Sequence, residues 1–149
     1  MSVGDACLRL LAVALLLVDA AAASGAEDLP GRLRQVERAF RDGDATTLRL
    51  SIVTDGKVRV GLRDMTDGQG WYSPGQLQVL FARVFAEHVT REIAFGPEGV
   101  VEPTPGTAFA RGRWVRRARG GGPEVVDTVV LTLREQGGDW RVIEIRTAR

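Results

Sequence analysis

The sequence predicts an α+β domain in which N-terminal helices pack inside a curled antiparallel sheet. In the first half of the chain, apolar residues recur every three or four positions, as in amphipathic helices. The second half contains four strand-like runs separated by turns rich in glycine and proline. Helices first and strands last is an order typical of α+β domains. With 149 residues, of which 44% are hydrophobic and 26% charged, the chain is long enough for one domain with its own core.

The net charge of the chain is only +1, which gives no argument for binding to nucleic acid, so we expect no such partner.

The first 26 residues are predicted to be a signal peptide. Arg9 precedes an apolar run, Leu10 to Val18, and small residues suited to cleavage follow it. Because a membrane-spanning helix needs about 20 apolar residues, we expect no stable span after cleavage. The alternatives are an uncleaved anchor and a buried N-terminal helix. We therefore expect export, to the periplasm or beyond, of a single domain formed by residues 27–149. Cys7, the only cysteine, would leave with the signal peptide, so the mature chain would have no disulfide or thiol ligand.

The stretch "AFRDGDATTL", residues 39–48, predicts that one helix ends and another begins within two residues. Gly43 suits the left-handed conformation that often ends a helix. Asp44 can accept hydrogen bonds from the free amides of the next helix. The first helix has one apolar face, formed by Leu29, Leu33, Val36 and Phe40.

A second strong helix signal begins at Ser73. A capping serine, a proline at the first helical position and Gln76 three residues after the serine form a capping box. One face of this helix carries Leu77, Leu80, Phe81, Val84, Phe85 and His88. Before it, residues 57–62 alternate as in a strand and residues 63–70 read as a polar loop.

The remaining strands are predicted at residues 91–95, 107–118, 124–135 and 140–148. The last three are long and follow one another as hairpins, so antiparallel pairing is expected. In the third run Val129, Leu131 and Leu133 alternate with more polar positions, which predicts one apolar face. The sheet must wrap the long helix to bury Phe81 and Phe85.

The corner at residues 39–48, the segment "WYSPGQLQVLFARVF" (71–85) and the closing "GGDWRVIEIR" (137–146) resemble the nuclear transport factor 2-like superfamily, also called the cystatin-like cone. Within it, the chain looks most like secreted bacterial domains of unknown function. The resemblance covers residues 29–149. It implies a cone with a pocket between helices and sheet, and a possible homodimer through the outer sheet face. Some relatives are isomerases, dehydratases or cyclases, and others only bind ligands or partners, so the site must decide the function.

The candidate catalytic groups are few. His88 is the only histidine, and Asp64 and Asp67 flank a turn. Catalytic relatives have a carboxylate or histidine in the pocket, but no Asp-His pair stands at matching positions here, so no catalytic residue is assigned. The turn lacks the ligand spacing of a calcium loop, and no metal or cofactor is expected. A basic run could bind an anion or polysaccharide, or lie solvated beside acids; it comprises Arg111, Arg113, Arg116, Arg117 and Arg119.

The sequence favours an exported, non-catalytic cone domain that binds a small molecule or a protein partner. The ligand-binding candidates are Tyr72 at the mouth of the cone, together with Phe85, His88 and Trp114. Trp71, Trp114 and Trp140 are otherwise expected to be core or pocket walls. Two alternatives stay open: a pocket enzyme of the isomerase or dehydratase type, which needs His88 or Asp64 buried in the cone, and a dimeric interaction module that uses the sheet face.

Overall fold

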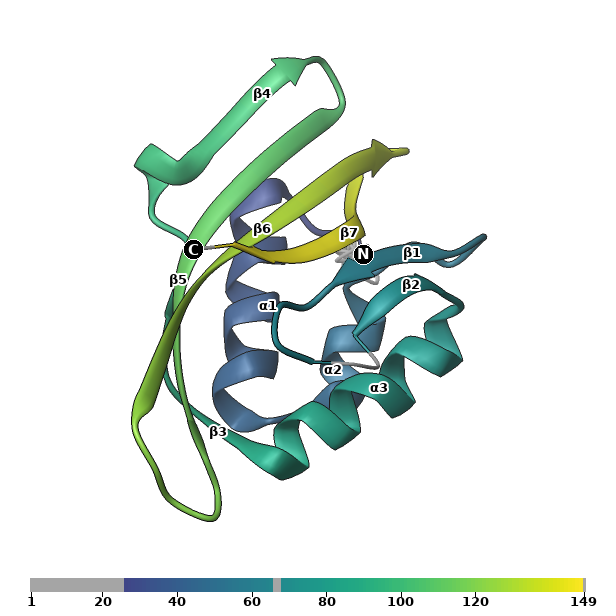
Figure 1. Ribbon diagram of the computed structural model, residues 1–149. Helices are drawn as coiled ribbons and strands as arrows, with labels where there is room; N and C mark the ends of the chain where they lie inside the picture. Colours follow the sequence, from purple (N-terminus) through teal and green to yellow (C-terminus); the bar gives the residue numbers. More distant parts are fainter. Residues whose placement is uncertain (1–25, 66–67, 149) are drawn as a thin grey trace, which may run out of the picture.

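The structure is a computed structural model that describes residues 26–65 and 68–148. The predicted signal peptide, except for Ala26, lies outside the described residues, and so do Cys7 and Asp67. The helices are α1 (Leu29–Asp42), α2 (Ala45–Leu50), α3 (Pro74–Glu87) and a single 3₁₀ turn, η1 (Pro97–Gly99). The strands are β1 (Val58–Gly61), β2 (Gln69–Tyr72), β3 (His88–Ala94), β4 (Val100–Thr104), β5 (Thr107–Ala118), β6 (Glu124–Gln136) and β7 (Asp139–Ala148). Figure 1 shows their arrangement.

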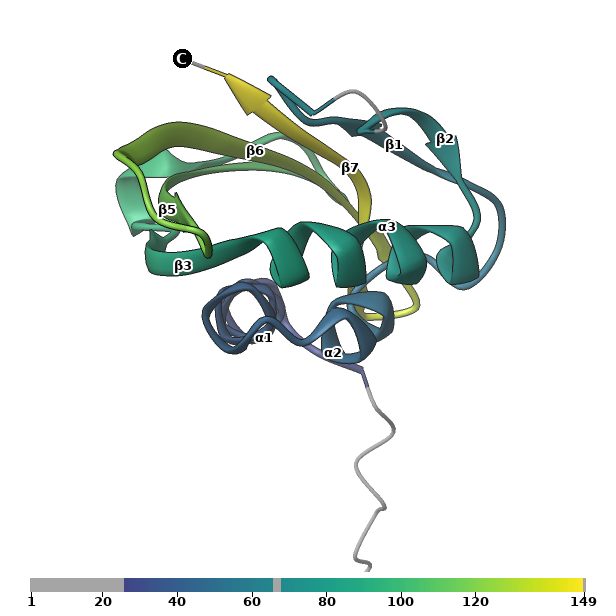
Figure 2. The same ribbon diagram turned by 60° about the horizontal axis from the view of Figure 1, so that its bottom comes forward.

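The corner between α1 and α2 has the predicted chemistry. Gly43 adopts φ 66° and ψ 34°, the left-handed conformation that ends α1. Asp44 caps α2 by accepting from the backbone N–H groups of Thr46 and Thr47, both at 3.0 Å. The corner therefore turns the chain so that both helices lie on the same side of the sheet (Figure 2).

The predicted capping box of α3 is confirmed. Ser73 Oγ accepts from the backbone N–H of Gln76, and the Gln76 side chain accepts from the backbone N–H of Ser73. The helix ends one residue earlier than its apolar pattern predicted. His88 has extended dihedral angles and begins β3, so its ring leaves the helical face of Leu77 and Phe81.

The sheet has seven strands in the order β2-β1-β7-β6-β5-β3, with β4 also paired to β5. The α+β class is confirmed, but the sheet is mixed rather than purely antiparallel, because β1 runs parallel to β7. The antiparallel prediction rested on hairpins, and no hairpin joins β1 to β7, which are separated by most of the domain. The sequence also missed β2 and β4, which are short and carry mostly exposed residues.

The sheet curls around the helices and buries their apolar faces. Figure 2 shows α3 crossing beneath the sheet, and α1 and α2 lie on the same side of the sheet as α3. The pairing skips one residue in β3, between Thr90 and Glu92, and one in β7, between Val142 and Glu144, and such bulges bend these strands. Along β6, Val129, Leu131 and Leu133 are buried, as their alternation predicted.

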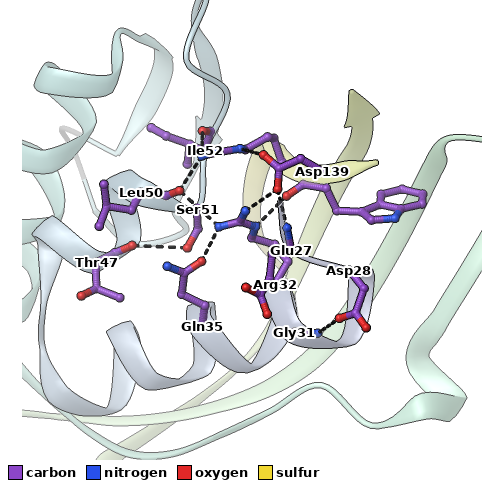
Figure 3. Close-up of polar contacts among 12 residues, drawn as sticks. Glu27, Asp28, Gly31, Arg32, Gln35, Thr47, Leu50, Ser51, Ile52 and Asp139 are labelled. Atoms are coloured by element: carbon purple, nitrogen blue, oxygen red, sulfur yellow. Dashed lines mark hydrogen bonds and ion pairs between the residues drawn. The ribbon is translucent and has the colours of Figure 1, made fainter. Parts of the chain in front are cut away.

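A buried arginine fastens α1 to the start of β7 (Figure 3). Arg32 is 2% exposed and donates to the carbonyl of Trp140 at 2.6 Å, to Asp139 Oδ1 at 2.7 Å and to the carbonyl of Leu50 at 3.2 Å. Asp139 also accepts from the backbone N–H of Glu27 at 2.8 Å. Burial would raise the pKa of Asp139, but hydrogen bonds from Glu27 and from two arginines outweigh it and lower that pKa. Three segments distant in sequence thus share one charged network.

Candidate functional site

Four aromatic rings pack against one another in the core between the helices and the sheet. Phe40 packs edge-on against Trp114, Phe85 and Phe81, with ring centroids 5.2, 5.5 and 5.7 Å apart. All four side chains are buried. Edge-to-face packing of this kind adds about 0.5–1.5 kcal/mol per pair to the effect of burial. Two predicted ligand residues, Phe85 and Trp114, therefore belong to the packed core.

A polar cluster adjoins this core where α3 passes into β3. Arg116 donates to Asp127 Oδ2 through Nε at 3.2 Å and through Nη2 at 3.0 Å. Both residues are buried, and Asp127 Oδ1 has no hydrogen-bond partner in the part of the chain that the structure describes. The Arg116 guanidinium also lies 5.2 Å from the ring centroid of Trp114, a cation–π contact.

His88 borders the same cluster. Its Nδ1 lies 3.4 Å from Arg116 Nη1. Burial, followed by the positive charge of Arg116, lowers the pKa of His88, while Glu87 opposes the shift. The neutral ring can then accept a hydrogen bond from the guanidinium. Because Asp127 already neutralises Arg116, the cluster is internally paired.

Tyr72 lies apart from the other three ligand candidates. It is half-buried at the end of β2, and its hydroxyl is 3.4 Å from the carbonyl oxygen of Gln69. Tyr72 and His88 stand at opposite ends of the 14-residue α3, which spans about 21 Å at 1.5 Å per residue. The structure brings Phe85, His88 and Trp114 into one neighbourhood and leaves Tyr72 outside it. Ligand contact at these four positions stays a prediction.

The other candidates from the sequence lie at the surface or in ion pairs. Asp64 is exposed and pairs with Arg63 at 3.1 Å. Of the basic run, Arg113 pairs with Glu92 at 2.8 Å on the outer face, as expected for a solvated face. Arg116 differs, because it points inward with Trp114. Trp71 was expected in the core, but it is 62% exposed on the outer face of the sheet.

An apolar groove of about 420 Å³ opens between α1 and the segment from β3 to β4. Glu37 Oε1 accepts from the backbone N–H of Phe95 at 2.7 Å and so holds the two walls together. Sequence reasoning missed this groove, because it depends on how the turn after β3 packs against α1. The groove is lined by Leu29, Pro30, Leu33, Arg34, Glu37, Phe95, Pro97 and Val100.

Within the described residues, no group of three or more histidine, cysteine, aspartate or glutamate side chains is placed to hold a metal ion. No helix among these residues is long and apolar enough to cross a membrane.

Comparison with known proteins supports the fold. No family model matches the chain, and no curated protein matches it. Solved structures do. A DUF4783 family protein from Bacteroides uniformis ATCC 8492 has a TM-score of 0.60 and 15% identity, with 78% of this chain and 94% of that one covered. A ketosteroid isomerase-like protein from Erwinia carotovora atroseptica SCRI1043 has a TM-score of 0.60 and 16% identity, covering 79% and 90%.

A third similar structure contains a small ligand. It is a hypothetical protein with a ketosteroid isomerase-like fold from Catenulispora acidiphila DSM 44928, in complex with trimethylamine. It has a TM-score of 0.61 and 11% identity, with 80% of this chain and 85% of that one covered. At sequence identities this low, the similarity shows a shared fold and does not show a shared activity. The chain therefore has the nuclear transport factor 2-like fold, which it shares with ketosteroid isomerase-like proteins and with bacterial proteins of unknown function.

Proposed function

We propose that the chain is a non-catalytic binding domain that holds a small, largely apolar ligand in the groove between α1 and β4. The observation that carries the proposal is an open groove of about 420 Å³ with mostly apolar walls, beside a core that is packed with aliphatic and aromatic side chains. Small-molecule sites usually have volumes of about 300–1,000 Å³, apolar walls and a few placed polar groups.

The polar groups of the groove favour a ligand with one acidic end. Glu37 is committed to the backbone of Phe95. Arg34 lies one helical turn before it and forms no hydrogen bond or ion pair within the described part of the chain. A guanidinium beside apolar walls suits a carboxylate attached to a hydrocarbon body. We therefore take a medium-chain fatty acid as the ligand class.

The ionisable groups favour binding over turnover. Asp127 is neutralised by Arg116, His88 faces the same guanidinium, and Asp64 is exposed. A general base needs to reach a bound substrate in a form that accepts a proton, and none of these three side chains lines the groove. The trimethylamine complex of the Catenulispora acidiphila protein supports the compatibility of the fold with small ligands.

The experiment is a calorimetric titration of the full chain with decanoate and with decanol. We expect decanoate to bind, Val100→Trp to abolish binding by filling the groove, and Arg34→Gln to remove the preference for the acid. Val79→Trp is the matched control, because Val79 is an exposed valine on α3. A folded Val100→Trp protein that binds decanoate as tightly as the wild type would sink the proposal.

A homodimer through the outer sheet face is a second candidate role. Val101 and Phe109 lie directly opposite each other on β4 and β5, and both are exposed, at 56% and 38%. Light scattering at high protein concentration should give twice the monomer mass, and Phe109→Glu should restore the monomer. A wild-type monomer at high concentration would remove this candidate.

Export is part of the same proposal. The apolar run at residues 10–18 and the small residues after it support removal of residues 1–26. Expression of the full chain in a bacterium, followed by N-terminal sequencing of the envelope fraction, should give a chain that starts near Glu27. Recovery only as an intact chain in the cytoplasm would contradict export.

A further inference from the structure

A polar hollow of about 400 Å³ lies on the outer face of the sheet, where β2, β1 and β7 run side by side. It is separate from both the aromatic core and the groove along α1. Its lining includes Arg59, Gly61, Arg63, Gln69, Trp71 and Arg146.

The strand register places these residues in two rows across the three strands. In the first row, Trp71 pairs with Arg59, which pairs with Glu144. In the second row, Gln69 pairs with Gly61, which pairs with Arg146. A side chain at the central glycine would begin 3.4 Å from the Arg146 side chain and 3.6 Å from that of Gln69. Gly61 therefore keeps the floor of the hollow open between its two polar neighbours.

The hollow carries positive charge that its own acids do not fully pair. Glu144 is the carboxylate between two guanidiniums, 3.0 Å from Arg146 Nε and 3.7 Å from Arg59 Nε. Thr132 Oγ1 donates to the same carboxylate at 3.0 Å. Arg63 pairs with Asp64 only through Nε, and its Nη1 is buried without a hydrogen-bond partner in the described chain. The side chains of Arg59 and Arg146 are more than half exposed, so an anion in the hollow can pair with them.

The exposed indole of Trp71 stands between this hollow and a second one of about 320 Å³. Arg59 and Trp71 line both. The second hollow adds the cations Lys57 and Arg134 and the acids Asp55 and Glu144. The two hollows thus form a basic trough that passes over one aromatic side chain. A ligand that fills it must be longer than a single small anion.

We propose that this trough binds an acidic oligosaccharide. Carboxylates of the sugar units pair with Arg59 and Arg146, and the apolar face of one ring lies on Trp71. The Gln69 amide donates to the carbonyl of Leu62 at 2.7 Å, which leaves its oxygen as an acceptor in the hollow. An acceptor beside cations suits a ligand that carries hydroxyl donors as well as acid groups. Proteins that bind single-stranded nucleic acid stack successive bases on several aromatic side chains. Among the described residues, the lining of the trough has a single aromatic side chain, Trp71, so a nucleic-acid strand fits it less well.

The test is a titration of the full chain with tetragalacturonic acid at low and high salt, with cellotetraose as the neutral comparison. Calorimetry measures binding for the wild type and for every variant, because Trp71→Ala removes the exposed indole. In the proteins that keep Trp71, a change in tryptophan emission also reports on the trough, since Trp71 is exposed whereas Trp114 and Trp140 are buried. We expect binding of the acid that weakens with salt. The variants Arg59→Gln and Trp71→Ala should each weaken it about tenfold or more, and Gly61→Val should block it. Arg113→Gln, an exposed arginine on the same face that pairs with Glu92, should stay within about twofold of the wild type.

The outcomes separate cleanly. Binding that is lost in the three trough variants and kept in Arg113→Gln supports the site. The proposal is overturned if folded wild-type protein does not bind the acid, if cellotetraose binds as well, or if a tetranucleotide binds in its place. Near-ultraviolet circular dichroism of each variant shows whether it is folded, and Trp71→Ala changes an exposed side chain, so this variant keeps the test valid should Gly61→Val unfold.

Discussion

Arg116 directs two of its nitrogens, Nε and Nη2, to one oxygen of Asp127, at 3.2 and 3.0 Å, and the second carboxylate oxygen is buried without a hydrogen-bond partner among the described residues. Both residues are almost inaccessible to solvent. Breaking a buried ion pair by removing one partner typically costs about 3–5 kcal/mol, since the other charge stays buried. Replacing both by apolar residues of similar size is often neutral or stabilising.

We therefore predict that Asp127→Leu lowers the free energy of unfolding by about 3–5 kcal/mol. The double variant Arg116→Met with Asp127→Leu should recover most of that loss, because no unpaired charge remains. Urea unfolding monitored by circular dichroism gives both values. Arg113→Gln with Glu92→Gln, an exposed ion pair at 2.8 Å, is the control and should change stability by less than about 1 kcal/mol. Equal losses of stability in the single and double variants would contradict the prediction. They would show that Arg116 and Asp127 stabilise the fold by their packing and not by pairing their charges.

The pKa of His88 should lie below the ordinary value of about 6.5, because burial and the neighbouring Arg116 disfavour the imidazolium. A histidine whose pKa is lowered in the folded state contributes stability above its unfolded pKa. That contribution is lost as the pH falls from about 6.5 through the folded value. We predict that His88→Gln flattens this part of the stability curve. Since the chain has one histidine, a single set of imidazole NMR signals gives the pKa directly. A measured pKa at or above 6.5 would refute the placement of His88 against Arg116.

Asp139 makes the stability of the domain depend on pH in the acidic range, below the range in which His88 titrates. Burial opposes ionisation, but three hydrogen-bonded groups hold the carboxylate ionised and lower its pKa. Stability from this group is complete above the unfolded pKa of about 3.9 and is lost as the pH falls through the lower folded value. Asp139→Asn should therefore cost about 1–3 kcal/mol at neutral pH, with the difference from wild type shrinking below about pH 4. Asp55→Asn, at an exposed position, serves as the control. A pH-independent difference between wild type and Asp139→Asn would contradict the charged network.

The local signals of the sequence predicted the helices well. The Gly43-Asp44 corner and the Ser73-Gln76 capping box depend on neighbouring residues alone, and the structure contains both. The parallel pairing of β1 with β7 was not predictable in this way, since it joins segments without a connecting turn. The long runs were clear. Of the two four-residue strands, β1 has alternating buried residues and was predicted, whereas β2 is mostly exposed and was missed.

The candidate site was harder to predict because exposure depends on pairing partners. Trp71 looked like a core residue by type, but its place opposite Arg59 puts it on the outer face. Alternation from Trp114 points Arg116 inward, and that signal was present in the sequence. The sequence analysis did not use it. An arginine is rarely buried without a partner, and the partner of Arg116, Asp127, lies on the next strand. The groove along α1 requires the packing of η1 and β4, which no local pattern encodes.

The corner itself gives the last prediction. Gly43 has φ 66°, where a Cβ atom costs about 1–2 kcal/mol, although the atom would meet the Phe85 side chain only at an ordinary 3.5 Å. Gly43→Ala should therefore lower the free energy of unfolding by about that amount through backbone strain and not through a clash. Gly75→Ala is the matched control: it lies in the first turn of α3 at negative φ with open space around it, so stability should stay level or rise by up to about 1 kcal/mol. Gly43→Asn should recover part of the loss, because asparagine tolerates the left-handed region better than alanine. If Gly43→Ala and Gly75→Ala had the same effect in urea unfolding, the left-handed corner would not be what joins α1 to α2.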